Sequence, residues 1–516
     1  MTSRVQALSW FHEALAALAP GRLLRRRLQT APRLDAYRHI AVLAFGKAAP
    51  GMLAAWLQAA PGLGARAGAV EAWLSAPAGA PAPAWPPAVP VHAFIGGHPE
   101  PNPASLEAGA AMLAAARALA ASAQPALLVA LISGGGSALV EATLEAPLPG
   151  RQLGDALSAS GRPLPASRRH SGAGLPGIEA RTPSDHRERP QQKVASHGGL
   201  ERKQPWCSPS RRSQAAFPSG KAAPALRAAG HSDAVLALAE AQTLHRALVA
   251  SGAPIGEINC IRKRWSAFKG GRLAAAAAGP HVDQVSWILS DVAGDDWASV
   301  ASGPTFPEAS TAADYEAAWR RWLPDLPCPP APPAPPPGDA VFARSQWHCL
   351  ASNRDATTQL AGLAAAAGYA PVVVDTDADE AEEPMAAEQL AARWRALRAA
   401  HPRPALIAGG EVRVRLPAAH GRGGRNQLLA LRIATWLEGE PFVFLSAGTD
   451  GVDGSSPAAG ALVDGHTLAR ARAAGLDPAR HLAAFDPHPL LAATGDLVLT
   501  GPTGNNLRDL RLFLPA

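Results

Sequence analysis

Residues 421–427 read GRGGRNQ, so two arginines stand among three glycines, directly before the apolar run LLALRIA. Glycines let backbone N–H groups close around a phosphate, and guanidinium groups bind its oxygens in pairs. The same composition is typical of RGG tracts that contact nucleic acids without sequence preference. The segment therefore predicts either a phosphate clamp or a nucleic-acid contact, and the rest of the chain has to distinguish them.

Two further turns have residues suited to binding an anion. In LAFGKAAPGM, Lys47 follows an apolar run and precedes a helical pattern, where a lysine can meet an anion together with the positive end of the helix. In ISGGGSALV, Gly134, Gly135, Gly136 and Ser137 follow the run LLVALI. These residues predict either a phosphate-binding turn or simply a tight connection between a strand and a helix.

A cationic stretch, INCIRKRWSAFKGGRLA, begins at residue 258. It is either a solvated helix face or a site for an anionic substrate or polyphosphate. Its polar and charged candidates are Asn259, Arg262, Lys263, Arg264, Lys269 and Arg272.

Carboxylates follow two other apolar runs. Asp291 comes directly after VSWILS, and Asp450 and Asp453 follow FVFLSAGT. Carboxylates at such positions bind Mg²⁺ or orient a hydroxyl group, although an Asp-Gly pair alone is usually a turn. Together with the cationic glycine loops, these acids predict a phosphate-handling enzyme that transfers a phosphoryl group.

The elements that must position these residues follow an α/β pattern. Short apolar runs end in glycine-rich or polar turns and are followed by alanine-rich helical stretches, as in IAVLAFGKAAPGMLAAWLQAA. Strands that alternate with helices predict mainly parallel sheets, in which ligands bind at the carboxyl ends of the strands. The candidate residues lie at those ends.

Two stretches interrupt this pattern. Residues 151–230 are rich in Arg, Ser, Pro and Gly and are expected to form a mostly disordered insertion. Residues 323–339, LPDLPCPPAPPAPPPGD, predict an extended connector. We therefore expect an N-terminal α/β domain over residues 1–322, interrupted by the insertion, and a C-terminal α/β domain over residues 340–516.

Charge and cysteine content limit the functional classes. Residues 151–230 hold 14 Lys or Arg and 5 Asp or Glu, a net charge of +9. Because the entire chain carries +6, the remainder carries −3, so a nucleic-acid partner is disfavoured. The four cysteines form no CxxC pair, which fits a reducing cytoplasm, and the apolar runs are too short for a membrane span.

Ten motifs in one order, from about residue 41 to 512, resemble the glycerate 2-kinase family, whose C-terminal region is called MOFRL. They include GKAAPGM, GGHPEPNPAS, ISGGGSAL, LASNRDA, AGGEVRV, GRGGRNQLLAL, AGTDGVDG and GDLVLTGPTGNNLRDL. The resemblance implies two α/β domains with the active site between them. It also implies transfer of the γ-phosphoryl group of ATP to the 2-hydroxyl of D-glycerate, giving 2-phosphoglycerate and requiring Mg²⁺.

The resemblance also suggests roles for individual residues. Lys47 matches the family's active-site lysine, and of Arg422 and Arg425 the second is favoured as catalytic, so that Lys47 and Arg425 offset charge on the moving phosphoryl group. Asp291 and Asp450 orient the hydroxyl or hold Mg²⁺. Arg262 and Lys269 are expected to bind a carboxylate or an outer phosphate. Asn353 matches a cleft position, and residues 134–137 line the phosphate side.

Two alternatives stay open. Members of the family are often labelled hydroxypyruvate reductase, an NAD(P)H-dependent activity for which no nicotinamide-binding fingerprint is visible in this sequence. An inactive or nucleic-acid-binding relative built around the basic insertion is the other.

GRGGRNQ occurs once and precedes a helical pattern, whereas RGG tracts are repeated, so we interpret it as a phosphate or substrate clamp.

Overall fold

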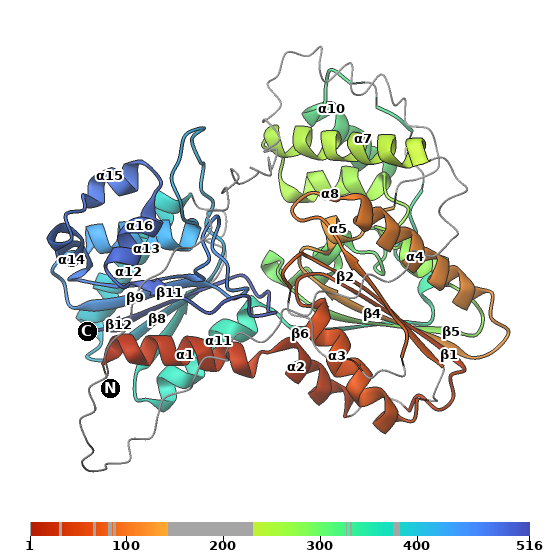
Figure 1. Ribbon diagram of the computed structural model, residues 1–516, viewed down its shortest axis with the longest axis horizontal. Helices are drawn as coiled ribbons and strands as arrows, with labels where there is room; N and C mark the ends of the chain where they lie inside the picture. Colours follow the sequence, from red (N-terminus) through yellow and green to blue (C-terminus); the bar gives the residue numbers. More distant parts are fainter. Residues whose placement is uncertain are drawn as a thin grey trace, which may run out of the picture.

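A computed structural model describes the chain except for residues 1, 30–32, 66–68, 81–84, 86–88, 143–230, 327, 331–332 and 375–381. The described part forms two α/β domains that lie side by side (Figure 1). The predicted fold class, two α/β domains with mainly parallel sheets, is confirmed. The insertion expected at 151–230 lies outside the described residues.

The first domain is built on a six-stranded sheet in the order β3-β2-β1-β4-β5-β6, and every neighbouring pair in it is parallel. In this order the chain reverses its direction of travel between β1 and β4, and ligands bind beside the strand ends at such a point. The strands are β1 (His39–Phe45), β2 (Val70–Ala76), β3 (Val91–Ile95), β4 (Ala126–Ser133), β5 (Val282–Leu289) and β6 (Ser345–Ala351).

Helices cover both faces of this sheet, so its strands are apolar on both sides. In β1, Ile40, Val42 and Ala44 belong to the apolar core on one face, whereas Leu43 and Phe45 belong to the core on the other. The helices of this domain are α2 (Pro20–Leu28), α3 (Ala49–Ala59), α4 (Pro103–Ala120), α5 (Gly136–Leu139), α7 (His231–Ala250), α8 (Ile255–Arg264), α9 (Arg272–Ala277) and α10 (Ala312–Trp322).

The second domain has a mixed six-stranded sheet in the order β11-β10-β9-β12-β8-β7. Strands β7, β8, β9 and β11 point one way, while β10 and β12 run against their neighbours. The sequence pattern did not predict these two antiparallel strands. The strands are β7 (Ala370–Val374), β8 (Pro404–Gly410), β9 (Phe442–Gly448), β10 (Gly460–Asp464), β11 (Leu497–Val498) and β12 (Asp509–Pro515).

The helices of the second domain pack on both sides of its sheet (Figure 1). They are α11 (Asn353–Ala366), α12 (Glu383–Ala400), α13 (Arg425–Trp436), α14 (Thr467–Ala473), α15 (Pro478–Ala483) and α16 (Pro487–Ala493).

The first helix of the chain, α1 (Ser3–Ala17), packs on the second domain rather than on the first. Ala7, Trp10, Phe11 and Ala14 recur at helical spacing and form its buried stripe against α11, β9 and β12. Arg4 adds ion pairs to two acids of that domain, at 2.6 Å to Asp496 and also to Asp464. Helix α2 follows at once and packs on α3 of the first domain.

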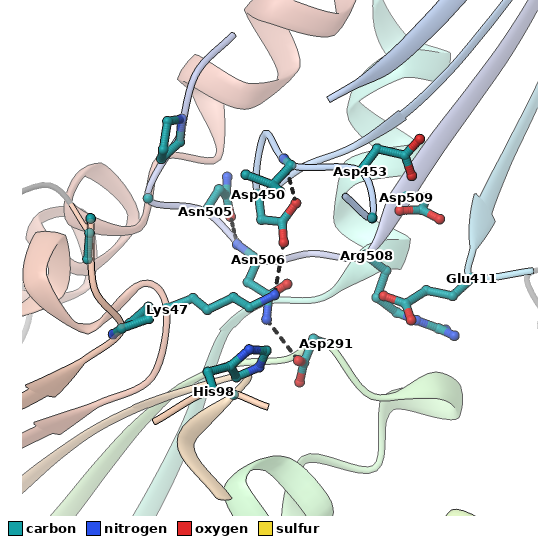
Figure 2. Close-up of a pocket in the computed structure, with 18 of the residues that line it drawn as sticks. Lys47, His98, Asp291, Glu411, Asp450, Asp453, Asn505, Asn506, Arg508 and Asp509 are labelled. Carbon is teal, nitrogen blue, oxygen red and sulfur yellow. Dashed lines mark hydrogen bonds and ion pairs between the residues drawn. The ribbon is translucent and has the colours of Figure 1, made fainter. Parts of the chain in front are cut away.

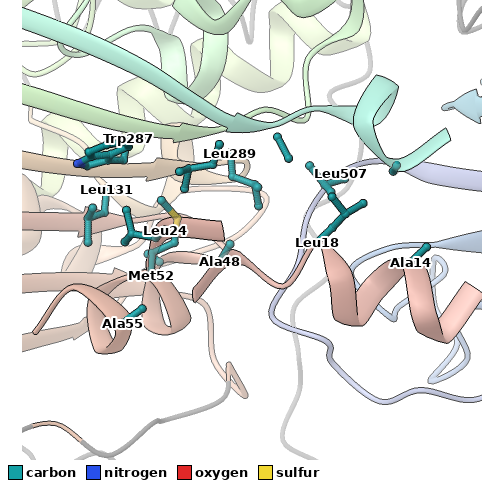
Figure 3. Close-up of a cluster of buried hydrophobic side chains, with 14 of the residues drawn as sticks. Ala14, Leu18, Leu24, Ala48, Met52, Ala55, Leu131, Trp287, Leu289 and Leu507 are labelled. Atoms are coloured by element: carbon teal, nitrogen blue, oxygen red, sulfur yellow. The ribbon is translucent and has the colours of Figure 1, made fainter. Parts of the chain in front are cut away.

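One apolar core therefore runs through both domains. Leu24, Met52 and Leu131 of the first domain join, through Leu18, to Leu507 of the second (Figure 3). Because the two sheets share this core, the α1–α2 junction fixes how their edges face each other.

The first sheet also extends beyond the predicted domain boundary. Strand β6 follows the proline-rich stretch 323–339 yet pairs with β5 of the first sheet. The chain enters the second domain only after Ala351, where α11 begins. In the described part of the chain, no helix is both long and apolar enough to cross a membrane.

Replacement of Phe11 tests the shared core. Phe11→Ala removes a side chain that is 0% exposed, so we expect it to lower the free energy of unfolding by about 3–5 kcal/mol. Glu13→Ala, at an exposed position of the same helix, is the control and should change it by less than about 0.5 kcal/mol. Urea unfolding measures both, and an equal effect of the two variants would contradict the shared core.

Candidate functional site

A cleft of about 510 Å³ lies where the strand ends of the two sheets face each other (Figure 2). The first domain contributes turns that follow β1, β2, β3, β4 and β5. The second domain contributes the ends of β8 and β9 and the start of β12, which meets them because β12 is antiparallel. The polar side chains that line it are Lys47, His98, Asp291, Glu411, Arg425, Asp450, Asp453, Asn505, Asn506, Arg508 and Asp509.

On the first-domain side, the turns after β1 and β4 are joined by hydrogen bonds. The Lys47 N–H donates to the carbonyl of Gly134 at 2.9 Å, and the Ala48 N–H donates to Ser133 Oγ at 3.0 Å. Gly134 allows a close approach, because a Cβ there would overlap the Asp291 carboxylate and the Asn506 amide, which would then have to move.

Two polar contacts cross the cleft from one domain to the other (Figure 2). Lys47 Nζ forms an ion pair with Asp450 Oδ2 at 2.9 Å. Asn506 Nδ2 donates to Asp291 Oδ2 at 2.8 Å. Residues more than 200 positions apart in the sequence therefore meet at one point.

On the second-domain side, Arg425 connects two acids. Its Nε donates to Asp509 Oδ2 at 2.6 Å, one Nη donates to Asp509 Oδ1 at 3.0 Å, and the ion pair with Glu411 is 2.8 Å long. Despite burial, the Arg425 charge holds the pKa of Asp509 below its ordinary value, and the acids in turn raise the pKa of Arg425.

The GRGGRNQ segment is a turn that fits around a buried carboxylate. Asp453, 2% exposed, accepts from the backbone N–H groups of Asn426 at 3.1 Å and Gln427 at 2.9 Å, in the first turn of α13. A Cβ at Gly424 would overlap Asp453. Burial nevertheless raises the pKa of Asp453 to about 6.

Burial also changes the acidity of other groups in the cleft. It raises the pKa of Asp291, against the opposing charge of Lys47, and it raises the pKa of Glu411, against Arg425. The enclosed position of His98 and the nearby Lys47 charge lower the pKa of this imidazole to about 4. At neutral pH the cleft therefore holds a neutral imidazole and a carboxylate, Asp291, that accepts a proton more readily than an ordinary aspartate.

The sequence-predicted residues divide into two groups in this structure. The cleft is lined by six of them, Lys47, Gly135, Asp291, Arg425, Asp450 and Asp453. The others that we named lie outside its lining: Gly134, Gly136, Ser137, Asn259, Arg262, Lys263, Arg264, Lys269, Arg272, Asn353 and Arg422.

The residues outside the lining have identifiable contacts. Lys269, 0% exposed, forms an ion pair with Glu141, and burial lowers its pKa to about 8. Arg262 donates to the carbonyl of Ser137 at 3.3 Å, and Ser137 Oγ lies 2.7 Å from Ser302 Oγ. Arg262 and Ser302 therefore hold the glycine turn in place through its last residue, Ser137.

Two of them lie in the second domain. Asn353 donates to the carbonyls of Leu507 and Asp509, at 2.6 and 3.1 Å, and so holds the segment that precedes β12. Arg422 is exposed, and its backbone N–H donates to Asp486.

Sequence reasoning did not single out several residues that line the cleft, among them His98, Glu411, Asn506, Arg508 and Asp509. Glu411 directly follows β8, as Asp450 follows β9, so the rule that ligands bind at strand ends would have found it. Arg508 and Asp509 had no such signal, because they lie at the start of β12, an antiparallel strand whose direction the local pattern does not reveal.

The fold and the cleft define a two-domain α/β protein with a charged site between facing strand ends. A model described as "Domain of unknown function (DUF4147)" matches residues 6–162 and 220–330, and a model described as "MOFRL family" matches residues 404–509. The chain therefore belongs to the family of the first model and carries a C-terminal region of the MOFRL family.

Named relatives share this sequence. A protein of Agrobacterium vitis that is provisionally named hydroxypyruvate reductase is 38% identical over 54% of this chain and 65% of its own length. The D-glycerate 2-kinase of Thermotoga maritima is 36% identical over 54% of this chain and 67% of its own length. The aligned regions thus span about two thirds of these relatives.

A solved structure matches over the full length. The crystal structure of glycerate kinase from Thermotoga maritima superposes with a TM-score of 0.70 at 25% identity, covering 99% of both chains. The arrangement of the two domains is therefore shared with that enzyme.

Replacement of Gly134 tests the close approach of the two domains. In Gly134→Ala the new Cβ would overlap the carboxylate of Asp291, so we expect the free energy of unfolding to fall by about 1–3 kcal/mol. Gly362→Ala, an exposed position inside α11 with no atom within 4 Å of the added Cβ, should instead stabilise the protein by up to about 1 kcal/mol. Thermal unfolding distinguishes the two, and equal stabilisation would refute the close contact.

The raised pKa of Asp453 predicts a dependence of stability on pH. The folded protein binds the proton of the Asp453 carboxyl more tightly than the unfolded chain does. The contribution of this proton to the free energy of unfolding is therefore complete below pH ~4 and is lost as the pH rises through about 6, a change of about 3 kcal/mol. Asp453→Asn does not titrate there. Urea unfolding between pH 4 and 7 should give a difference between wild type and variant that changes with pH; a constant difference would contradict the shifted pKa.

Proposed function

We propose that this protein transfers the γ-phosphoryl group of ATP to the 2-hydroxyl of D-glycerate, giving 2-phosphoglycerate. The observation that carries the proposal is the cleft itself, which gathers Lys47 and Asp291 of the first domain and Arg425 and Asp450 of the second. Lys47 and Asp450 form an ion pair across the domain border. Phosphoryl transfer needs cations around the moving group and a carboxylate that orients the attacking hydroxyl. The relatives named glycerate kinase support the choice of substrate.

Each side chain then has a defined task. Asp291 accepts the proton of the 2-hydroxyl, because burial raises its pKa. The hydroxyl oxygen forms a bond to the γ-phosphorus while the bond from that phosphorus to the oxygen of ADP breaks. Lys47 and Arg425 offset the negative charge that this transfer spreads over the phosphoryl oxygens. Gly135 leaves room for the phosphates beside Lys47.

Mg²⁺ fits this set of donors as an ion that arrives with the nucleotide. Proteins usually hold it by one or two carboxylates while phosphate oxygens and waters complete the octahedron. With Asp291 as the base, Asp450 would supply such a carboxylate, and the ion would neutralise phosphate charge. Within the described residues, no group of three or more His, Cys, Asp or Glu side chains is arranged to hold a metal by protein ligands alone.

The other site assignments follow from position. Arg262 donates to the Ser137 carbonyl of the glycine turn and Lys269 pairs with Glu141, so neither is assigned to a carboxylate or phosphate of a substrate. Asn353 positions the segment that holds Asp509. We also propose that the protein acts in the cytoplasm, since none of the three described cysteines forms a disulfide.

The decisive experiment incubates the purified protein with D-glycerate, ATP and Mg²⁺ and identifies the product by phosphorus NMR. We expect 2-phosphoglycerate, and we expect Lys47→Ala and Arg425→Ala to lower kcat by about 100-fold or more. Arg415→Ala is the control, because this exposed arginine pairs with Glu382 outside the cleft.

Other outcomes would redirect the proposal. Formation of 3-phosphoglycerate would keep the kinase and change the hydroxyl that reacts. Oxidation of NADH in the presence of hydroxypyruvate, with no phosphorylated product, would favour the reductase. Silence in both assays would identify an inactive relative.

A further inference from the structure

Arg508 has an unusual backbone for a residue that lines the cleft. Its φ is +65°, in the left-handed region that side chains other than glycine and asparagine rarely adopt. Among the described residues only four that are not glycine have a positive φ: Ala301, Ser302, Phe485 and Arg508. Such conformations cost folding free energy and are concentrated at functional sites.

Thr449 holds Arg508 in this conformation. The carbonyl of Arg508 accepts from the Thr449 N–H at 2.9 Å and from Thr449 Oγ1 at 2.8 Å, and Leu507 N–H donates to the same hydroxyl at 2.7 Å. Thr449 is buried at the end of β9 and directly precedes Asp450. The strain is therefore built into the segment that carries the site.

The neighbours of Arg508 in the chain face two walls of the cleft. Asn506 donates to Asp291 of the first domain, and Asp509 binds Arg425 of the second. The Arg508 charge counteracts the raised pKa of both Asp291 and Glu411, so the guanidinium lies within electrostatic reach of each. Figure 2 shows its side chain directed toward Glu411.

The charges that line the cleft limit what can bind there. Five acids, Asp291, Glu411, Asp450, Asp453 and Asp509, face three cations, Lys47, Arg425 and Arg508. An anionic acceptor therefore has to be met by a cation close to the point of reaction. Lys47 lies beside Gly135 and His98 of the first domain, where the donor phosphates would bind, whereas Arg508 belongs to the second-domain wall.

We propose that Arg508 is the specificity-determining residue that binds the carboxylate of the acceptor, an inference that rests on the proposed function. A guanidinium binds a planar carboxylate through two parallel hydrogen bonds. In a 2-hydroxy acid the carboxylate is attached to the carbon that bears the reacting hydroxyl. A residue near Asp291 that reaches from the opposite wall is therefore suited to hold the carboxylate while Asp291 takes the proton.

The test compares D-glycerate with D-glyceramide, whose neutral amide replaces the carboxylate. We expect Arg508→Gly to lower kcat/KM for D-glycerate about 10- to 100-fold, the effect of losing hydrogen bonds to a charged group, and to leave D-glyceramide and the KM for ATP nearly unchanged. Because glycine adopts a positive φ without strain, the melting temperature should not fall.

A matched variant and a binding measurement separate this role from a structural one. Phe485→Gly removes another side chain with a positive φ, outside the cleft lining, and should not change the preference for acid over amide. Calorimetry measures binding of D-glycerate directly, without turnover, and should show binding to the wild type that Arg508→Gly weakens.

Three results are decisive. If Arg508→Gly weakens the turnover or the binding of D-glycerate but not of D-glyceramide, the inference is supported, and the binding result counts even if no phosphoryl transfer occurs. If Arg508→Gly lowers kcat/KM equally for D-glycerate and D-glyceramide, Arg508 acts only as a partner of Glu411 and the inference is overturned. If the wild type neither binds nor phosphorylates D-glycerate, the proposed function and this inference both fail.

Discussion

The apolar core that α1 and α2 share between the two domains is the constraint on which the site depends. Without it, mainly polar contacts such as Lys47 with Asp450 and Asn506 with Asp291 would hold the strand ends of one sheet opposite those of the other. Phe11 and Leu507 belong to this core on the second-domain side, and Leu24 and Leu131 on the first. Hydrophobic burial has no preferred direction, so shape complementarity at this junction has to set the angle between the sheets. The cleft-lining Asn505 is tied to the same junction, because its side chain donates to the carbonyl of Leu18 at 3.1 Å.

Given that frame, polar contacts make the local adjustments. Two contacts cross the domain border, Lys47 with Asp450 and Asn506 with Asp291. Each of them joins a side chain of one domain to a side chain of the other. In GRGGRNQ the glycines let the backbone close around the carboxylate of Asp453, while Arg425 turns toward Asp509 and Glu411. The phosphate-clamp hypothesis for this segment is thereby refined: it is a protein carboxylate that its backbone amides bind, and its arginine is the part that faces the cleft.

Buried charge is concentrated in two layers around the glycine turn. The lower layer, Lys269 with Glu141 and Arg262 with Ser137, lies outside the cleft lining, whereas the upper layer, Lys47 with Asp291 and Asp450, faces the cleft. From the sequence alone the two layers are alike, because each consists of charged residues beside apolar runs. The folded structure separates them, because Arg262 of α8 donates to Ser137 and Ser137 contacts Ser302, so the lower layer is held in contacts with the protein itself.

The sequence by itself determined the α/β class, the strands that precede the candidate residues, and the candidate residues at strand ends, such as Lys47, Asp291 and Asp450. These properties follow from local periodicity and from the rule that parallel strands end at one edge. The tertiary structure decided that β6 completes the first sheet, that α1 packs on the second domain, and that β12 runs antiparallel, which brings Arg508 and Asp509 to the cleft. Local patterns cannot contain this information, because strand direction and helix docking depend on contacts between segments hundreds of residues apart, and those contacts form only when the chain is folded.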